Sequence, residues 1–277
     1  MIELPEGAAW LFCPADRPER FAKAASVADV VIIDLEDGVA HDSKAAARGQ
    51  LARSLDGLDP RRTVIRVNPV GTDDHRLDLE TLDGLGFTML MLAKAESAEQ
   101  LDTLSGFTVV ALCETPRGIA AARLIAASPA CAALMWGSED LIAAIGGVSS
   151  RDASGAYRDV VRYARSQVLI AGAAENKPVL DSVFFDLADL PGLAAEAEDA
   201  AASGFSAKVC LHPRQVPIIR NAFASSPERL AWATRVLHEA ASHAGVGAFA
   251  LDGVMVDEPL IRQARLIISR QPTNDPT

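Results

Sequence analysis

An apolar segment of strand length, followed by a segment with helical periodicity, occurs eight times along this chain of 277 residues. The expected strands cover residues 8–14, 30–37, 62–68, 87–93, 108–114, 131–136, 178–185 and 206–211. Several are almost continuously apolar, which is typical of parallel strands that are covered on both faces. Strand–helix alternation predicts a parallel sheet. Eight units without an evident edge strand predict that the sheet closes into a (β/α)8 TIM barrel.

An open, doubly wound sheet is the alternative architecture for the same alternation. That fold would place a glycine-rich phosphate-binding turn directly after the first strand. The sequence there is Cys13-Pro14-Ala15-Asp16, which contains no glycine. The barrel is therefore the favoured prediction.

Residues 1–224 account for the eight units, and residues 225–277 form a C-terminal helical extension. In this extension we expect helices over 227–244 and 258–269, a short β segment over 248–255, and a hinge at Gly245-Val246-Gly247. Such an extension can serve as a lid, or as an arm that contributes to the site of a neighbouring subunit. It can equally be an extra helix that packs on the outside of the barrel.

The net charge of −11 argues against nucleic acid and anionic membrane surfaces as partners. No apolar segment approaches the roughly 20 residues that span a bilayer. The first residues, Met1 to Glu6, lack the basic and apolar parts of a signal peptide, so we expect a cytoplasmic protein. The four cysteines lie in or beside expected strands, which predicts buried, reduced thiols.

Two carboxylates follow neighbouring strands at the point where each strand ends. Glu114 ends the segment 108–114, and Asp140 follows the segment 131–136. Oxygen ligands without a nearby Cys or His suit a hard cation, Mg2+ or Mn2+. Either carboxylate could instead cap the following helix. Several strand-end carboxylates at one barrel mouth favour the metal site.

Further charged side chains are expected at the same mouth. Arg66 ends the third strand, where it can pair with carboxylates or stabilise a developing oxyanion, and both roles stay open. Glu36 and Asp37 follow the second strand. Because side chains alternate along a strand, at most one of these two faces the metal. The other caps a helix or orients a metal-bound water.

Basic residues lie near several strand ends, where solvated surface is the ordinary interpretation. They are Arg17, Arg20 and Lys23 after the first strand, Lys94 after the fourth, and Lys208 in the eighth. Arg17 and Arg20 open a helix at the rim, which is a place for a phosphate. His212, followed by Pro213, is interpreted as a structural turn residue, and Asp257 as an N-cap.

Seven motifs in unbroken order resemble the citrate lyase beta-subunit-like family of the HpcH/HpaI aldolase superfamily. They begin at Leu11, Asp34, Arg66, Glu114, Gly137, Lys208 and Gly253, and read LFCPADRPERF, DLEDGV, RVN, ET, GSEDL, KVCLHPRQV and GVMVDEP. The chain departs from the family pattern at Ala15, Ala93 and Ala207. These departures affect the expected path of coenzyme A and leave the expected metal ligands intact.

The resemblance implies a Mg2+-dependent carbon–carbon lyase that cleaves or forms a 3-hydroxyacyl-CoA such as citramalyl-CoA or malyl-CoA, with acetyl-CoA and a 2-oxo acid as products. It implies that Glu114 and Asp140 are the metal ligands and that Glu114 also contacts the substrate. Arg66 would contact the thioester or carbonyl oxygen, and Glu36 would assist catalysis. Asp257 would be an acid–base residue in a neighbouring subunit of a homo-oligomer, a trimer or hexamer. The basic residues implied to contact coenzyme A are Arg17, Arg20, Lys23 and Lys208.

Three alternatives stay open. The chain could be the beta subunit of a citrate lyase complex that acts on a carrier-protein thioester, or a non-catalytic barrel that binds CoA esters. An aldolase acting on free 2-oxo acids is disfavoured, because the basic residues at the rim would have no phosphates to contact.

Overall fold

The computed structural model describes residues 4–55, 57–243 and 247–269. Two compact units divide the chain, one over Met1–Arg220 and the other over Asn221–Thr277. The first contains the predicted barrel, and the second contains the C-terminal extension.

Eight parallel strands form a closed barrel in sequence order, so the predicted TIM-barrel architecture is confirmed. The strands are β1 (Ala9–Pro14), β2 (Val30–Asp34), β3 (Thr63–Val67), β4 (Met89–Leu92), β5 (Thr108–Cys113), β6 (Cys131–Trp136), β7 (Val179–Asp181) and β8 (Ala207–Cys210). Closure is complete because β1 pairs with both β2 and β8. No edge strand is left in this ring.

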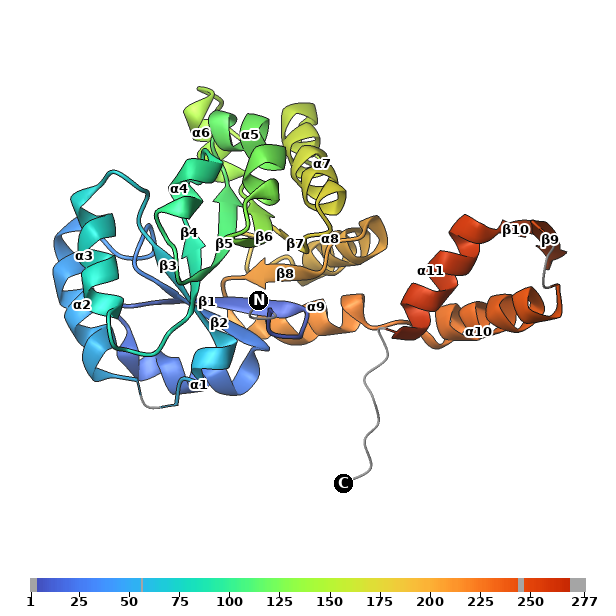
Figure 1. Ribbon diagram of the computed structural model, residues 1–277, viewed down its shortest axis with the longest axis horizontal. Helices are drawn as coiled ribbons and strands as arrows, with labels where there is room; N and C mark the ends of the chain where they lie inside the picture. The colour runs from blue at the N-terminus through green and yellow to red at the C-terminus, as the bar shows by residue number, and fades with distance from the viewer. Residues whose placement is uncertain (1–3, 56, 244–246, 270–277) are drawn as a thin grey trace. The chain divides into compact units, whose positions relative to one another are not determined.

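Helices lie outside the ring of strands (Figure 1). They are α1 (Phe21–Val27), α2 (Lys44–Arg53), α3 (Asp73–Leu82), α4 (Ala98–Asp102), α5 (Pro116–Ala127), α6 (Glu139–Ala144), α7 (Asp159–Ala174), α8 (Leu190–Ser203) and α9 (Val216–Phe223). Short 3-10 turns precede α1, α2, β3 and α9, over Pro18–Arg20, His41–Ser43, Pro60–Arg62 and Pro213–Gln215.

Several boundaries differ from the predictions for local reasons. Strand β2 ends at Asp34 because its carboxylate accepts hydrogen bonds from the backbone N–H groups of Glu36 and Gly38, which close a turn. The sequence indicates a first helix from about Arg17, capped by Asp16, but Arg17 is the residue before a 3-10 turn and no side chain caps that turn. The sequence indicates a helix over 76–85, but α3 begins at Asp73, because Thr72 caps it by accepting the N–H of His75 at 3.1 Å.

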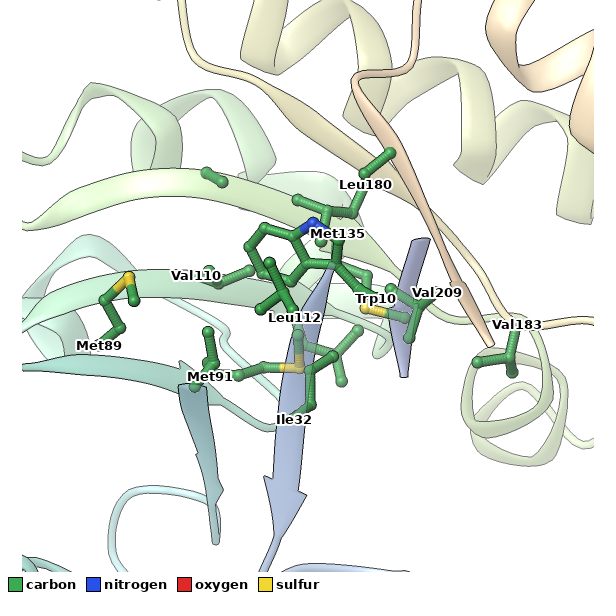
Figure 2. Close-up of a cluster of buried hydrophobic side chains, with 14 residues drawn as sticks. Trp10, Ile32, Met89, Met91, Val110, Leu112, Met135, Leu180, Val183 and Val209 are labelled. Atoms are coloured by element: carbon green, nitrogen blue, oxygen red, sulfur yellow. The ribbon is translucent and has the colours of Figure 1, made fainter. Parts of the chain in front are cut away.

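The barrel interior is filled by side chains at alternate positions of the strands (Figure 2). Along β5, Val110 and Leu112 face this core. Because side chains alternate along a strand, Glu114 continues the same row at the mouth. The strands therefore direct the residue after β5 into the opening above Leu112.

The C-terminal unit contains α10 (Pro227–Ser242), β9 (Ala248–Leu251), β10 (Val254–Asp257) and α11 (Glu258–Ser269). The antiparallel hairpin of β9 and β10 turns at Asp252 and Gly253, which both have positive φ, as a type I′ turn requires. A small core of Ala233, Val236 and Val256 joins the hairpin to the helices. Gly245 and Val246, the centre of the expected hinge, lie outside the described residues.

No helix within the described ranges is both long and apolar enough to cross a membrane.

Candidate active site

A cavity of about 350 Å³ opens at the barrel mouth. Its lining includes Arg66, Glu114 and Asp140, three of the residues selected from the sequence, together with Asp34 and Asp37. Leu112, Met135 and Val183 supply apolar surface, and all three also belong to the barrel core. The structure therefore brings the predicted charged residues together above an apolar floor.

Asp34 and Arg66 form the most rigid pair of the site. Their Cα atoms are partners in the β2–β3 ladder. The guanidinium donates from Nε and Nη2 to the two Asp34 oxygens, at 2.7 and 2.6 Å. Asp34 also accepts two backbone N–H groups, so its carboxylate cannot turn. A side chain held this way presents a fixed cation to the cavity.

Glu36 is buried beside this pair. Its carboxylate lies 3.1 Å from Arg66 Nη1, binds the Lys94 ammonium, and accepts the backbone N–H of Asp37 at 2.8 Å. Burial raises the pKa of Glu36, although Arg66 and Lys94 oppose this shift. Burial alone would lower the pKa of Arg66. The charges of Asp34 and Glu36 outweigh this effect and raise the pKa above its ordinary value, so the guanidinium stays charged.

Lys94 does not lie on the solvated surface expected from the sequence. It follows β4 with a φ of 50°, a left-handed backbone conformation that is uncommon outside glycine. Its backbone N–H donates to Glu114 Oε1 at 3.1 Å. Its ammonium lies 3.0 Å from an Asp37 oxygen and 3.3 Å from an Asp140 oxygen, besides its contact with Glu36. Lys94 therefore belongs to the site.

Glu114 is almost fully buried, and this burial raises its pKa to about 8, with a further contribution from the charge of Asp140. Arg66 and Lys94 act in the opposite direction. Gly137 is needed beside it, because a Cβ at that position would lie 2.8 Å from Glu114 Oε2. A cation from solution would remove the electrostatic cost of ionising Glu114.

Neither candidate metal ligand is the N-cap of its helix. Thr115 caps α5 by accepting the N–H of Gly118 at 3.0 Å, and Ser138 is the residue before α6. Capping was the alternative interpretation of Glu114 and Asp140, and the structure assigns it to neither. Both carboxylates instead line the cavity.

Two carboxylates fit a hard cation that completes its coordination with water and substrate oxygens. Over residues 4–55, 57–243 and 247–269, no group of three or more His, Cys, Asp or Glu side chains forms a complete cage. The chemistry of the donors, and the surplus of carboxylates over Arg66 and Lys94, agree with Mg2+ held by Glu114 and Asp140.

A second cavity of about 310 Å³ shares Phe12, Pro14 and Leu211 with the first. Arg20 and Lys23 line it, and their contact with the phosphates of coenzyme A stays a prediction. Arg17 is not in this lining, and its exposed side chain lies 3.8 Å from Asp16.

His212 also lines the second cavity. It caps the turn at Pro213–Gln215 by accepting the N–H of Arg214 at 3.1 Å. Its predicted structural role is confirmed.

The position of Lys208 contradicts the prediction that this residue contacts coenzyme A. It is 0 % exposed and lies in β8 between Ala207 and Val209, which face the barrel interior, so its own side chain points outward toward the helices. Its ammonium contacts Asp181 at 2.8 Å, Glu196 at 2.9 Å and the Ser182 carbonyl at 2.7 Å. The side chain leaves no surface for a ligand.

Asp257 is the last residue of β10, directly before α11 in the C-terminal unit. Its role in the barrel site of a neighbouring subunit stays a prediction.

The sequence did not identify Asp34 as a partner of Arg66, or Lys94 as part of the site. Alternation gives the signal for Asp34: Val30 and Ile32 face the core, so Asp34 faces the mouth. No comparable pattern indicates Lys94, because its direction depends on one left-handed residue after the strand.

Comparison with known proteins shows to which family this chain belongs. Residues 8–213, most of the barrel unit, match the model of the HpcH/HpaI aldolase/citrate lyase family. This chain belongs to the HpcH/HpaI aldolase/citrate lyase family. A citrate lyase subunit beta-like protein of Mycobacterium tuberculosis is 54% identical over 264 residues, which cover 95% of each chain. The mitochondrial citramalyl-CoA lyase of Mus musculus is 29% identical over 289 residues, covering 94% of this chain and 84% of the relative.

A crystal structure of the protein CitE from M. tuberculosis, in complex with magnesium, acetoacetate and coenzyme A, superimposes with a TM-score of 0.92. The two chains are 53% identical, and the match covers 96% of this chain and 98% of the other. Members of this family are thus structurally characterised with magnesium, which agrees with the cation inferred from the donors of this site.

Proposed function

We propose that this family member is a Mg2+-dependent carbon–carbon lyase that cleaves a 3-hydroxyacyl-CoA, such as citramalyl-CoA or malyl-CoA, to acetyl-CoA and a 2-oxo acid. The observation that carries the proposal is the shared cavity in which Glu114 and Asp140 lie with the rigidly held guanidinium of Arg66. The same residues would serve the reverse condensation.

Glu114 and Asp140 would hold Mg2+. When bound, the ion supplies Lewis acidity that lowers the pKa of the substrate hydroxyl and polarises the 2-oxo acid. The apolar floor of Leu112, Met135 and Val183 excludes water from the reacting atoms. Low local polarity strengthens every charge interaction above that floor.

Arg66 is the group that stabilises the negative charge that develops on the substrate. As the carbon–carbon bond breaks, its electron pair passes to the acetyl-CoA fragment, whose thioester oxygen becomes an enolate oxygen. A guanidinium fixed by two hydrogen bonds to Asp34 can stabilise that oxygen without reorganising. Glu36 supports this arrangement through its contact with Arg66 Nη1.

A carboxylate base must remove the hydroxyl proton, and a proton must later reach the enolate carbon. We assign this exchange to Asp257 of a neighbouring subunit, following the family resemblance of the segment that contains it. The assignment requires a homo-oligomer, for which we propose a trimer or a hexamer.

The two flanks of the cavity differ in charge. Arg20 and Lys23 lie on the flank that shares Phe12 with the main cavity. The other flank is a hollow of about 440 Å³ that shares Glu139 and Phe185 with the main cavity, and its further charged residues are Asp186, Asp189 and Arg151, so that acids outnumber bases. We therefore propose that polyanionic coenzyme A binds along the basic flank, and the family resemblance adds Arg17 as a contact of its phosphates.

Purified protein incubated with citramalyl-CoA or malyl-CoA tests the proposal. We expect release of acetyl-CoA with pyruvate or glyoxylate in Mg2+, and none in EDTA. Asp140→Asn should reduce turnover at least about 100-fold, because one of two protein ligands is lost. The matched control is Glu80→Gln, which removes a carboxylate from the exposed face of α3 and should leave turnover unchanged.

Similarity to citrate lyase beta-like proteins supports a second candidate, a lyase subunit that acts on a carrier-protein thioester. Turnover with a carrier-protein thioester and none with free CoA esters would favour it. Binding of CoA esters without turnover of either substrate class, by protein that binds Mg2+, would reject both lyases in favour of a binding barrel.

A further inference from the structure

Lys94 contacts both candidate metal ligands, and it does so with two different groups. Its backbone N–H holds Glu114, while its ammonium lies 3.3 Å from an Asp140 oxygen. The same ammonium binds Glu36 and Asp37, which fix it from the side of β2. One residue is thereby coupled to carboxylates from the ends of β2, β5 and β6.

Lys94 carries the positive charge that a lysine side chain ordinarily has at neutral pH. Its ammonium donates to Glu36 and lies 3.0 Å from an Asp37 oxygen and 3.3 Å from an Asp140 oxygen. A fixed positive charge in contact with a ligand carboxylate opposes the binding of a divalent cation to that carboxylate. Mg2+ therefore meets a site that already contains a cation.

Substrate anions offset this repulsion. A 2-oxo acid, or the carboxylate of the hydroxyacyl thioester, brings negative charge to the ion. Binding of the anion and binding of Mg2+ must then favour each other, because linkage between two sites is reciprocal.

We propose that Lys94 is a positioning residue that sets the Mg2+ affinity of the Glu114–Asp140 pair. Its charge keeps binding of the bare ion weak, so that tight binding requires a 2-oxo acid or substrate carboxylate to bind with the ion. This inference rests on the proposed function, since it assumes that these two carboxylates hold Mg2+.

A purely structural role for Lys94 predicts the opposite sign. If the residue only braced Glu114 and Asp140, removing its side chain would loosen both carboxylates and weaken Mg2+ binding. The direction of the change in affinity therefore separates the two roles.

Calorimetric titration of the full chain with Mg2+ is the test. Lys94→Asn removes the charge, and asparagine tolerates the left-handed backbone of this position. We expect it to bind Mg2+ about tenfold more tightly than the unmodified protein. Lys94→Arg keeps the charge and should bind Mg2+ about as weakly as the unmodified protein.

Lys177→Asn is the matched control. It removes the same charge two residues before β7, at the end of the barrel away from the mouth, and should not alter Mg2+ binding. Lys94→Gly repeats the main test with a residue that also accepts positive φ, in case the asparagine variant does not fold.

Repeating each titration with saturating pyruvate measures the coupling directly. We expect pyruvate to strengthen Mg2+ binding clearly in the unmodified protein and much less in Lys94→Asn. Equal or weaker Mg2+ binding by both Lys94→Asn and Lys94→Gly would overturn the inference and leave the lyase proposal standing. If the unmodified protein bound Mg2+ neither alone nor in the presence of pyruvate, the proposed function itself would be rejected.

Discussion

Two clusters of charged side chains occupy the barrel unit, and they differ in balance and in access. The mouth cluster consists of Asp34, Glu36, Asp37, Glu114 and Asp140 with Arg66 and Lys94, and it opens into the main cavity. The wall cluster lies between the barrel and α7 and α8, and consists of Asp181, Glu196 and Asp199 with Arg151, Arg165 and Lys208.

The wall cluster is balanced, with three acids and three bases. Asp181 accepts from Lys208, from Arg165 at 3.0 Å and from the indole N–H of Trp136 at 2.8 Å. Burial raises the pKa of Asp181, but Lys208 and Arg165 outweigh it and the net shift is downward. Each charged group there contacts a group of opposite charge, which is the arrangement of a structural network, although Arg165 Nη2 is buried without a hydrogen-bond partner among the described residues.

The mouth cluster has five acids and two bases, and the pKa of the buried carboxyl group of Glu114 moves upward. The comparison shows that burial alone does not identify a functional site, because both clusters contain buried carboxylates. The two clusters differ in charge balance, because the mouth cluster has more acids than bases and the wall cluster has equal numbers. This surplus of carboxylates over cations favours the proposed site for a cation from solution.

The largest expected effect is on the wall cluster. Lys208→Met should lower the free energy of unfolding by about 3–5 kcal/mol, because it leaves Asp181 and Glu196 with an uncompensated buried charge. Urea denaturation measures it, and Mg2+ affinity of the folded fraction should stay unchanged. A loss below about 1 kcal/mol would mean that this cluster is not a closed network.

A smaller effect is expected at the base of the mouth cluster. A Cβ on Gly38 would lie 2.2 Å from Asp34 Oδ2, so Gly38→Ala should displace the carboxylate that holds Arg66. We expect about 1–3 kcal/mol of destabilisation together with loss of turnover.

The control for this substitution is Gly49→Ala in α2, where the nearest contact is the flexible end of Arg53 at 3.4 Å. It should raise stability by about 0.5–1 kcal/mol, since alanine suits a helix interior better than glycine. A fall in stability of both variants would show that the clash with Asp34 is not the cause.

The pH dependence of stability should separate the clusters further. In EDTA, Glu114 binds its proton more tightly in the folded than in the unfolded protein. Stability from this group is therefore present below pH about 4.5 and is lost as the pH rises toward about 8, by up to about 1.4 kcal/mol per pH unit. Thermal melts across this range check it, and Glu114→Gln should flatten the slope. An unchanged slope in that variant would assign the titration to another group.

The smallest effect serves as a baseline outside both clusters. Arg76 and Glu80 form an exposed pair one turn apart on α3, at 2.7 Å. Arg76→Ala should change the free energy of unfolding by no more than about 0.5 kcal/mol in urea denaturation. A larger loss would indicate that exposed pairs cannot serve as a reference for the buried clusters.

Sequence reasoning predicted the barrel and the gathering of Arg66, Glu114 and Asp140, because both follow from local rules. Apolar runs locate the strands, and parallel strands bring their carboxyl ends to one rim. The same rules failed where a side chain's direction depends on its neighbours in space. Lys208 looks like a residue free to meet a ligand until strand alternation and the partners on β7 and α8 are known. Lys94 turns into the site only because its backbone is left-handed, which no periodic pattern predicts.

The ladder partnership of Asp34 and Arg66 ties the chemistry to the assembly of the barrel. A shift of β3 by one residue against β2 would send Arg66 to the opposite face of the sheet and separate it from Asp34. A chain that has refolded with this error could keep its helix content and compactness, but it would have no guanidinium at the mouth. Recovered turnover after refolding would therefore count only the molecules in which these two strands had found their native alignment, a quantity that circular dichroism does not resolve.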